Sequence, residues 1–175
     1  MNDYEKAQPS GLGKPAVYAL AESIAKQLDF KPGDDIDVLV KRLGGQVKIQ
    51  STIIRDPEQS GSLVVEGPND FTIIVPSHTS PVRDRFTIAH ELGHFFLHYV
   101  WRKKQGCHIG DRLIALRKGS DRVEWEANWF AGGFLMPENA FRQQFQRAAS
   151  IKAVADHFGV SRQAAEIRAK QLHLI

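Results

Sequence analysis

Residues 85–98 read RFTIAHELGHFFLH and place His90, Glu91 and His94 in an HExxH pattern. On a helix, residues four apart project from the same face, so His90 and His94 can bind one ion, and two imidazole ligands suit zinc. Glu91 lies about 100° around the helix from His90, beside the ion, where a carboxylate can take a proton from metal-bound water. The spacing therefore predicts a catalytic metal site.

The residues around this motif predict that it lies on a buried helix. Ser80 and Pro81 are typical of an N-cap and a first helical residue, which predicts a helix from about residue 82 to residue 98. Apolar residues occur around much of its circumference, as in a helix at the centre of a domain. An HExxH pattern in this context is more specific than the pattern alone.

Hydrophobic spacing along the rest of the chain predicts an α+β fold. Helical periods and short β-branched segments are separated by turn residues, so we expect a small, mainly antiparallel sheet, a central HExxH helix and a C-terminal helical pair. The expected strands are 46–53, 61–67 and 71–76, with a short one at 112–116 inside a loop over 102–120. The expected helices are 17–30, 36–43, 82–98, 121–136, 138–148 and two within 150–172.

The chain divides into three expected parts. Residues 1–15 hold two prolines and two glycines without periodicity, which predicts a flexible leader. Residues 16–149 are expected to form the metal-binding domain, and residues 150–175 a helix-turn-helix-like pair packed on it.

Charge and cysteine content limit the class of protein. Lys and Arg number 23 against 20 Asp and Glu, an imbalance that leaves nucleic-acid binding possible without indicating it. The single cysteine, Cys107, cannot form a disulfide within the chain, and the first thirty residues lack the apolar core of a secretory signal. No apolar run approaches the roughly 20 residues that span a bilayer. We therefore expect a cytoplasmic protein without a membrane partner.

A catalytic zinc usually has three protein ligands, so the motif needs one more. His98 lies one turn beyond His94, about 6 Å further along the axis, too far for three histidines on a straight helix to bind one ion. In EWEANWF, Glu124 and Asn128 lie four apart and can both face the histidines. We expect Glu124 as the third ligand, Asn128 as a hydrogen-bonding partner of an imidazole, and His98 as a pocket-wall or hydrogen-bonding residue. Glu126, about 200° from Glu124, is expected on a solvated face.

RFTIAHELGHFFLH followed by EWEANWFAGGFLMP resembles the ImmA/IrrE metallopeptidase family, in which an HExxH helix precedes an ExEAN-type helix ending in Leu-Met-Pro. The resemblance covers roughly residues 50–175. It implies a zincin-like domain with a gluzincin-type Zn²⁺ site: His90, His94 and Glu124 as ligands, Glu91 as the base and Asn128 in support. It also implies a cytosolic zinc metallo-endopeptidase whose protein substrate is a transcriptional repressor or antitoxin-like regulator.

One short stretch departs from that family. Gly132 and Gly133 stand where related sequences usually have Ala and Glu. Each glycine weakens a helix by about 1 kcal/mol relative to alanine. The pair is expected to permit close helix packing or a bend.

Residues 150–175 have the layout of a helix-turn-helix, with Gly159 at the turn. If the pair bound DNA, Arg162, Gln163 and Arg168 would meet phosphates or base edges. We favour the interpretation in which the pair covers the core, because acidic residues offset its bases.

Two other functions remain open at this level. The chain could be a DNA-binding transcriptional regulator, or a module that binds a partner without cutting it, with a structural metal site in either case. Glu91 favours chemistry, because a structural site needs no base. For a peptidase, GSLVVEG or FTIIVP is expected to align the substrate backbone by strand addition.

Overall fold

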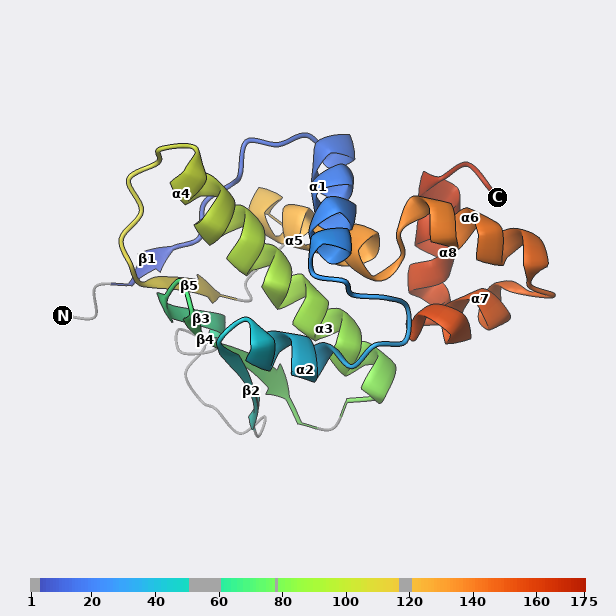
Figure 1. Cartoon of the computed structure of the whole chain (residues 1–175), viewed down its shortest axis with the longest axis horizontal. Helices are drawn as coiled ribbons and strands as arrows, with labels where there is room; N and C mark the ends of the chain where they lie inside the picture. Colours follow the sequence, from blue (N-terminus) through green and yellow to red (C-terminus); the bar gives the residue numbers. More distant parts are fainter. Residues whose placement is uncertain (1–3, 51–60, 78, 117–120) are drawn as a thin grey trace.

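A computed structural model of the chain describes residues 4–50, 61–77, 79–116 and 121–175. It has a mixed α+β architecture with a five-stranded sheet (Figure 1). In chain order the elements are β1 (Glu5–Lys6), α1 (Lys14–Gln27), α2 (Ile36–Arg42), β2 (Gly45–Gln50), β3 (Gly61–Gly67), β4 (Asp70–Pro76), α3 (Pro81–Gly93), the π-helix η2 (His94–Trp101), α4 (Arg102–Lys104), β5 (Leu113–Leu116), α5 (Arg122–Leu135), α6 (Glu138–Arg147), α7 (Ile151–Phe158) and α8 (Arg162–Gln171).

The strand order is β1-β5-β3-β4-β2, and the sheet is mixed. β3 pairs antiparallel with β4 and β5, whereas the edge strands β1 and β2 pair parallel with β5 and β4. The expectation of a mainly antiparallel sheet is therefore wrong. The turn between β3 and β4 is local and can be anticipated from GPND, but the pairing of β2 with β4 is long-range, and strand periodicity does not determine it.

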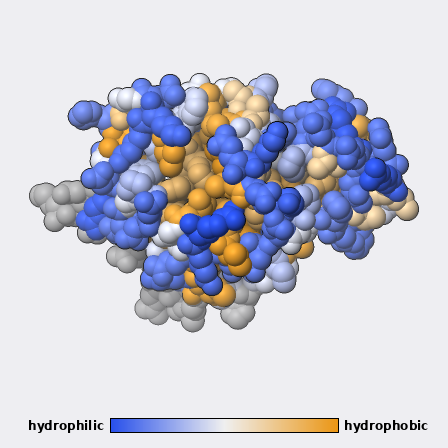
Figure 2. Space-filling model, in the orientation of Figure 1, coloured by the Kyte–Doolittle hydropathy of each residue, from blue (hydrophilic) through white to orange (hydrophobic). Residues whose placement is uncertain are grey.

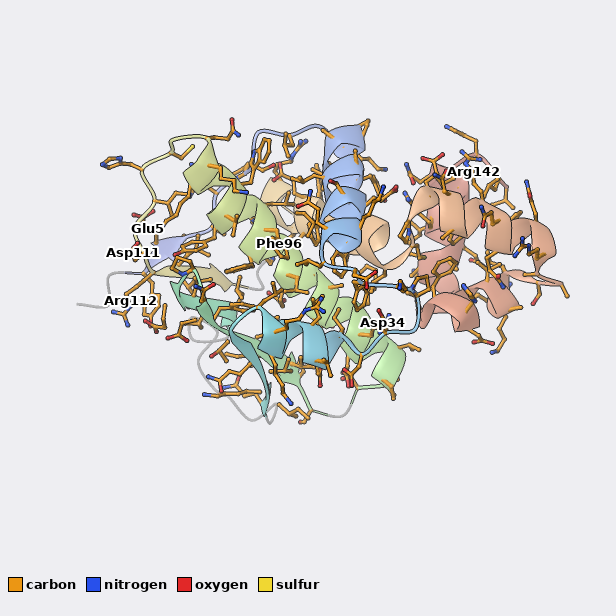
Figure 3. All side chains as sticks on the ribbon, in the orientation of Figure 1. Glu5, Asp34, Phe96, Asp111, Arg112 and Arg142 are labelled. Carbon is orange, nitrogen blue, oxygen red and sulfur yellow. The ribbon has the colours of Figure 1, made fainter. Side chains whose placement is uncertain are left out.

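A continuous helical segment crosses the middle of the molecule, with α2 on one side and α1 on the other (Figure 1). Ser80 caps α3 and Pro81 is its first residue, as expected. The segment then passes through η2 and α4 to Lys104, beyond the expected end, into residues expected as loop. Phe96, labelled in Figure 3, stacks on Phe130 of α5 with 5.7 Å between ring centroids. The central segment and α5 thus share a core.

α5 packs on both α1 and α3, and glycines permit the close approach. A Cβ atom on Gly93 of α3 would lie 3.1 Å from the Cα of Ala127 in α5. A Cβ atom on Gly133 of α5 would lie 3.0 Å from the carbonyl oxygen of Tyr18 in α1. Both distances are tighter than ordinary van der Waals contact. Close helix packing is thus what Gly133 permits.

Residues 4–13 are attached to the domain. β1 pairs with β5, and the Ser10 N–H donates to Glu126 Oε2 at 2.8 Å. The described part of the segment expected as a flexible leader over residues 1–15 therefore has fixed partners. These partners are distant in sequence, so local composition could not predict them.

α6, α7 and α8 lie together at one end of the molecule (Figure 1). Arg168 of α8 is 1% exposed; its Nε donates to the Met136 carbonyl oxygen at 2.9 Å, and its Nη2 to Glu22 Oε1 of α1 at 2.7 Å. The expectation that Arg168 could meet nucleic acid is therefore wrong, whereas Arg162 and Gln163 are exposed. Burial of this cation ties α8 to the rest of the fold.

The surface is uneven in hydropathy. Figure 2 shows apolar residues gathered in the middle of one face and mainly hydrophilic residues over the C-terminal helices. Within the described ranges, no helix combines the length and apolar character needed to cross a membrane.

Candidate metal centre

His90 and His94 lie one turn apart where α3 passes into η2. Their Nε2 atoms are 3.1 Å apart, and the residues are only 6% and 2% exposed. Both rings project from one face of the helical segment, as the four-residue spacing predicts.

Glu124 comes to the same point from α5. Asp121 caps this helix by accepting a hydrogen bond from the Glu124 N–H at 3.1 Å, which fixes the first turn. Glu124 Oε2 lies 3.2 Å from His90 Nε2, and Glu124 Oε1 lies 3.2 Å from His94 Nε2. The structure thus brings together the three residues expected as ligands.

The spacing of these atoms fits a zinc ion. Ligand atoms about 2.0–2.1 Å from a tetrahedral Zn²⁺ lie about 3.3 Å from one another. The observed separations are 3.1 Å between the two nitrogens, 3.2 Å from His90 Nε2 to Glu124 Oε2 and 3.2 Å from His94 Nε2 to the other carboxylate oxygen, Oε1. Glu91, fully buried, also brings an oxygen within 4.8 Å of the ligand nitrogens of both histidines. Three donors of ligand type with a further carboxylate beside them suit a catalytic site.

Burial and pairing set the protonation of the donors. Burial lowers the pKa of His94 to about 3. Burial acts to raise the pKa of Glu124, but hydrogen bonds to His90 and His94 outweigh it and lower that pKa to about 2. Burial also acts to lower the pKa of His90, yet its contacts with Glu124 and Glu91 raise it overall. The two histidines differ because Glu91 and Asn128 also favour protonation of His90, whereas the charges of His90 and His98 oppose protonation of His94.

Asn128 orients the first histidine. Its Oδ1 lies 2.9 Å from His90 Nδ1. An amide oxygen can only accept, so this contact places a proton on Nδ1 and leaves Nε2 as the ring nitrogen that would ligate a metal. The spacing between Glu124 and Asn128 predicts that Asn128 supports an imidazole, and its contact with His90 has the geometry for that role.

His98 and Glu126 form a second, fully buried pair behind the first site. His98 Nδ1 lies 3.0 Å from His94 Nδ1, and His98 Nε2 lies 3.1 Å from Glu126 Oε2. Both residues are 0% exposed. The expectation of a solvated face for Glu126 is therefore wrong, and of the two roles expected for His98 the structure has the hydrogen-bonding one.

The sequence prediction for Glu126 assumed that only one face of the helix is buried. α5 instead packs against α1, α3 and η2, so two positions about 200° apart are both buried. Hydrogen bonds from His98 and Arg122 outweigh burial and lower the pKa of Glu126 to about 2, so it is ionised at neutral pH. The sequence feature that could have indicated a buried Glu126 is His98, because a buried histidine needs a hydrogen-bonding partner.

His90 and Glu124 form part of the lining of a groove of about 890 Å³. Residues from α1, α3, α5 and α8 line it, so the C-terminal pair forms part of its wall. Its apolar lining includes Val82, Phe86, Trp129, Met136 and Ile167, and its basic lining includes Lys14 and Arg83. The groove therefore lies beside the candidate metal centre, and the buried His98 is not among its lining residues.

The expected role of β3 or β4 in aligning a substrate is wrong. β3 is paired with β5 and β4, and β4 with β3 and β2, so both are internal strands. Neither has a free edge to which a further strand could be added.

A family model matches more than half of the chain. The family model Peptidase_M78, the IrrE N-terminal-like domain, matches residues 50–170. The chain therefore belongs to the IrrE N-terminal-like peptidase family, as the paired motifs indicated. The family suggests metallopeptidase activity, and its metal is implied to be zinc.

A comparison with curated proteins found no match. Among solved structures, a Mycobacterium tuberculosis transcriptional regulator is similar, with a TM-score of 0.54 and 18% sequence identity. The similarity covers 89% of this chain and 46% of the regulator, so this chain spans less than half of that protein. At this identity the likeness concerns the fold.

Proposed function

We propose that the chain is a zinc-dependent endopeptidase that hydrolyses a peptide bond in a specific cytoplasmic protein. The observation that carries the proposal is the meeting of His90, His94 and Glu124 at separations that suit one zinc ion, with Glu91 beside them. Zincin-like architecture and a gluzincin-type ligand set are part of this proposal.

The proposed division of labour follows from these positions. His90, His94 and Glu124 would hold Zn²⁺, which supplies Lewis acidity: it lowers the pKa of its water to about 7 and polarises the substrate carbonyl. Glu91 takes the proton of the attacking water and passes it to the leaving amine. Asn128 keeps the His90 ring in the orientation that ligation requires.

The groove supports a polypeptide as substrate. Its apolar walls suit a segment with large apolar side chains, and Lys14 and Arg83 favour an acidic residue in that segment. We propose a transcriptional repressor or antitoxin-like regulator as the substrate class, which the ImmA/IrrE resemblance supports.

The test is to incubate the zinc-loaded protein with the regulator encoded beside its gene, comparing wild type with Glu91→Gln. Mass spectrometry should find one new terminus with wild type and none with the variant, while both bind about one zinc per chain. If both bind zinc and neither cuts, the proposal fails for that regulator.

A DNA-binding regulator, or a partner-binding module with a structural metal site, is the alternative. The exposed Arg162 and Gln163 near the start of α8 favour it, but Arg162 pairs with Glu166 at 2.8 Å and Arg168 is buried. Salt-dependent DNA binding that is lost in Arg162→Ala would promote this alternative.

A further inference from the structure

His94 is engaged on both sides of its ring. Its Nε2 faces the candidate metal centre, 3.2 Å from Glu124 Oε1, and its Nδ1 faces away, 3.0 Å from His98 Nδ1. A histidine that ligates through Nε2 must carry its proton on Nδ1. His94 Nδ1–H must then donate to His98, so His98 Nδ1 has to be the acceptor.

This requirement fixes the second ring as well. A neutral imidazole that accepts at Nδ1 carries its proton on Nε2. His98 Nε2 lies 3.1 Å from Glu126 Oε2, and a carboxylate is an acceptor that cannot reverse the direction of the bond when ionised. The three residues therefore form a line in which every hydrogen bond has one allowed direction.

The carboxylate at the end of the line is itself held in place. The Ser10 N–H donates to Glu126 Oε2 at 2.8 Å, and Arg122 Nε donates to Glu126 Oε1 at 2.8 Å. Arg122 also donates through Nη2 to the Leu12 carbonyl oxygen at 2.6 Å. The N-terminal segment thus takes part in fixing a group two hydrogen bonds away from the metal centre.

We propose that Glu126 and His98 are positioning residues that hold His94 in the tautomer whose Nε2 lone pair faces the metal, and that the backbone at Ser10 completes their support. The inference rests on the proposed metal site. It assigns a function to a carboxylate, Glu126, that would otherwise be a costly buried charge.

The first test needs no substitution. Long-range ¹H–¹⁵N spectra of the zinc-loaded protein, labelled in histidine, report which ring nitrogen carries the proton. At pH about 8 we expect His94 protonated on Nδ1 and His98 protonated on Nε2, each as a single tautomer. The reverse assignment for either ring overturns the proposal.

The second test measures zinc affinity by competition with a chromophoric chelator. Glu126→Leu removes the acceptor and should weaken zinc binding about ten- to hundredfold, with mixed His98 tautomers. Glu126→Gln keeps an acceptor oxygen and should restore much of the affinity. Glu22→Leu, which removes a carboxylate paired with Arg168 and not with a histidine, is the control and should leave affinity unchanged.

Outcomes of this second test separate the two proposals. If wild type binds no zinc, the proposed function fails. If wild type binds zinc and a folded Glu126→Leu variant binds it within twofold of wild type, only the positioning role fails. Ser10→Pro, which lacks the backbone donor, should weaken zinc binding relative to Ser10→Ala, which retains it, and equal affinities would remove Ser10 from the line.

Discussion

Replacement of Glu124 by alanine is expected to weaken zinc binding far more than replacement of His98. Structural zinc sites with four ligands bind with about 10–16 kcal/mol, so one strong ligand contributes about 2.5–4 kcal/mol. Glu124 also raises the pKa of His90, so its loss reduces competition by protons and offsets part of the effect. The loss before this offset corresponds to an affinity about 70- to 800-fold lower, which is the upper bound on the expected change.

The assay is chelator competition at pH about 7.5 with Glu124→Ala, His98→Ala and the control Glu138→Ala. Glu138 is a half-exposed carboxylate of α6 that pairs with Arg142, so its variant should bind zinc like wild type. His98→Ala should lose about tenfold through the orientation of His94 alone. Loss of the metal in His98→Ala with retention in Glu124→Ala would refute the ligand assignment.

Three further outcomes follow from the contacts. The pKa of Glu126 in the folded protein, about 2, lies below its ordinary 4.5, so the stabilisation by this carboxylate is present above pH about 4.5 and is lost as pH falls towards 2. Between pH 7 and 3.5, the free energy of unfolding of the metal-free wild type, measured in urea, should fall by ~1.4 kcal/mol more than that of Glu126→Gln. Equal losses in the two proteins would contradict this expectation. Arg168→Leu should lower the free energy of unfolding by about 2 kcal/mol, because Glu22 loses its partner. Arg162→Leu removes an exposed ion pair and should lower it by less than about 0.5 kcal/mol. Similar costs for the two variants would mean that α8 is not anchored through Arg168. Ile167→Asp in the groove should raise KM for the protein substrate and leave zinc affinity unchanged. Val38→Asp, at a similarly exposed position outside the groove, should change neither quantity. An unchanged KM for Ile167→Asp would mean that α8 takes no part in substrate binding.

Residues close in sequence were sufficient to predict where several helices begin. Ser80 caps α3 where the sequence predicts a cap, and Asp121 and Ser161 cap α5 and α8 in the same way, because N-capping depends on residues a turn away or less. The HExxH spacing and the Glu124-to-Asn128 spacing likewise depend on helix geometry alone. These features could be predicted from the sequence, and the structure brings those residues together.

Long-range and non-ideal features could not be predicted. The pairing of β2 with β4 and the attachment of Ser10 to Glu126 join segments that no local pattern connects. The π-helical geometry from His94 to Trp101 also departs from the period of 3.6 on which sequence interpretation rests. Both features meet at Glu126, which contacts Ser10 of the N-terminal segment and His98 of the π-helix η2.

The central claim, one zinc held by His90, His94 and Glu124 with Glu91 beside it, is tested most directly in crystals grown with zinc. Anomalous diffraction at the zinc edge should give one peak about 2.1 Å from the two Nε2 atoms and from a Glu124 oxygen, with the fourth position filled by solvent. A peak ligated by His98, or one closed by Glu91 as a fourth protein ligand, would contradict the account.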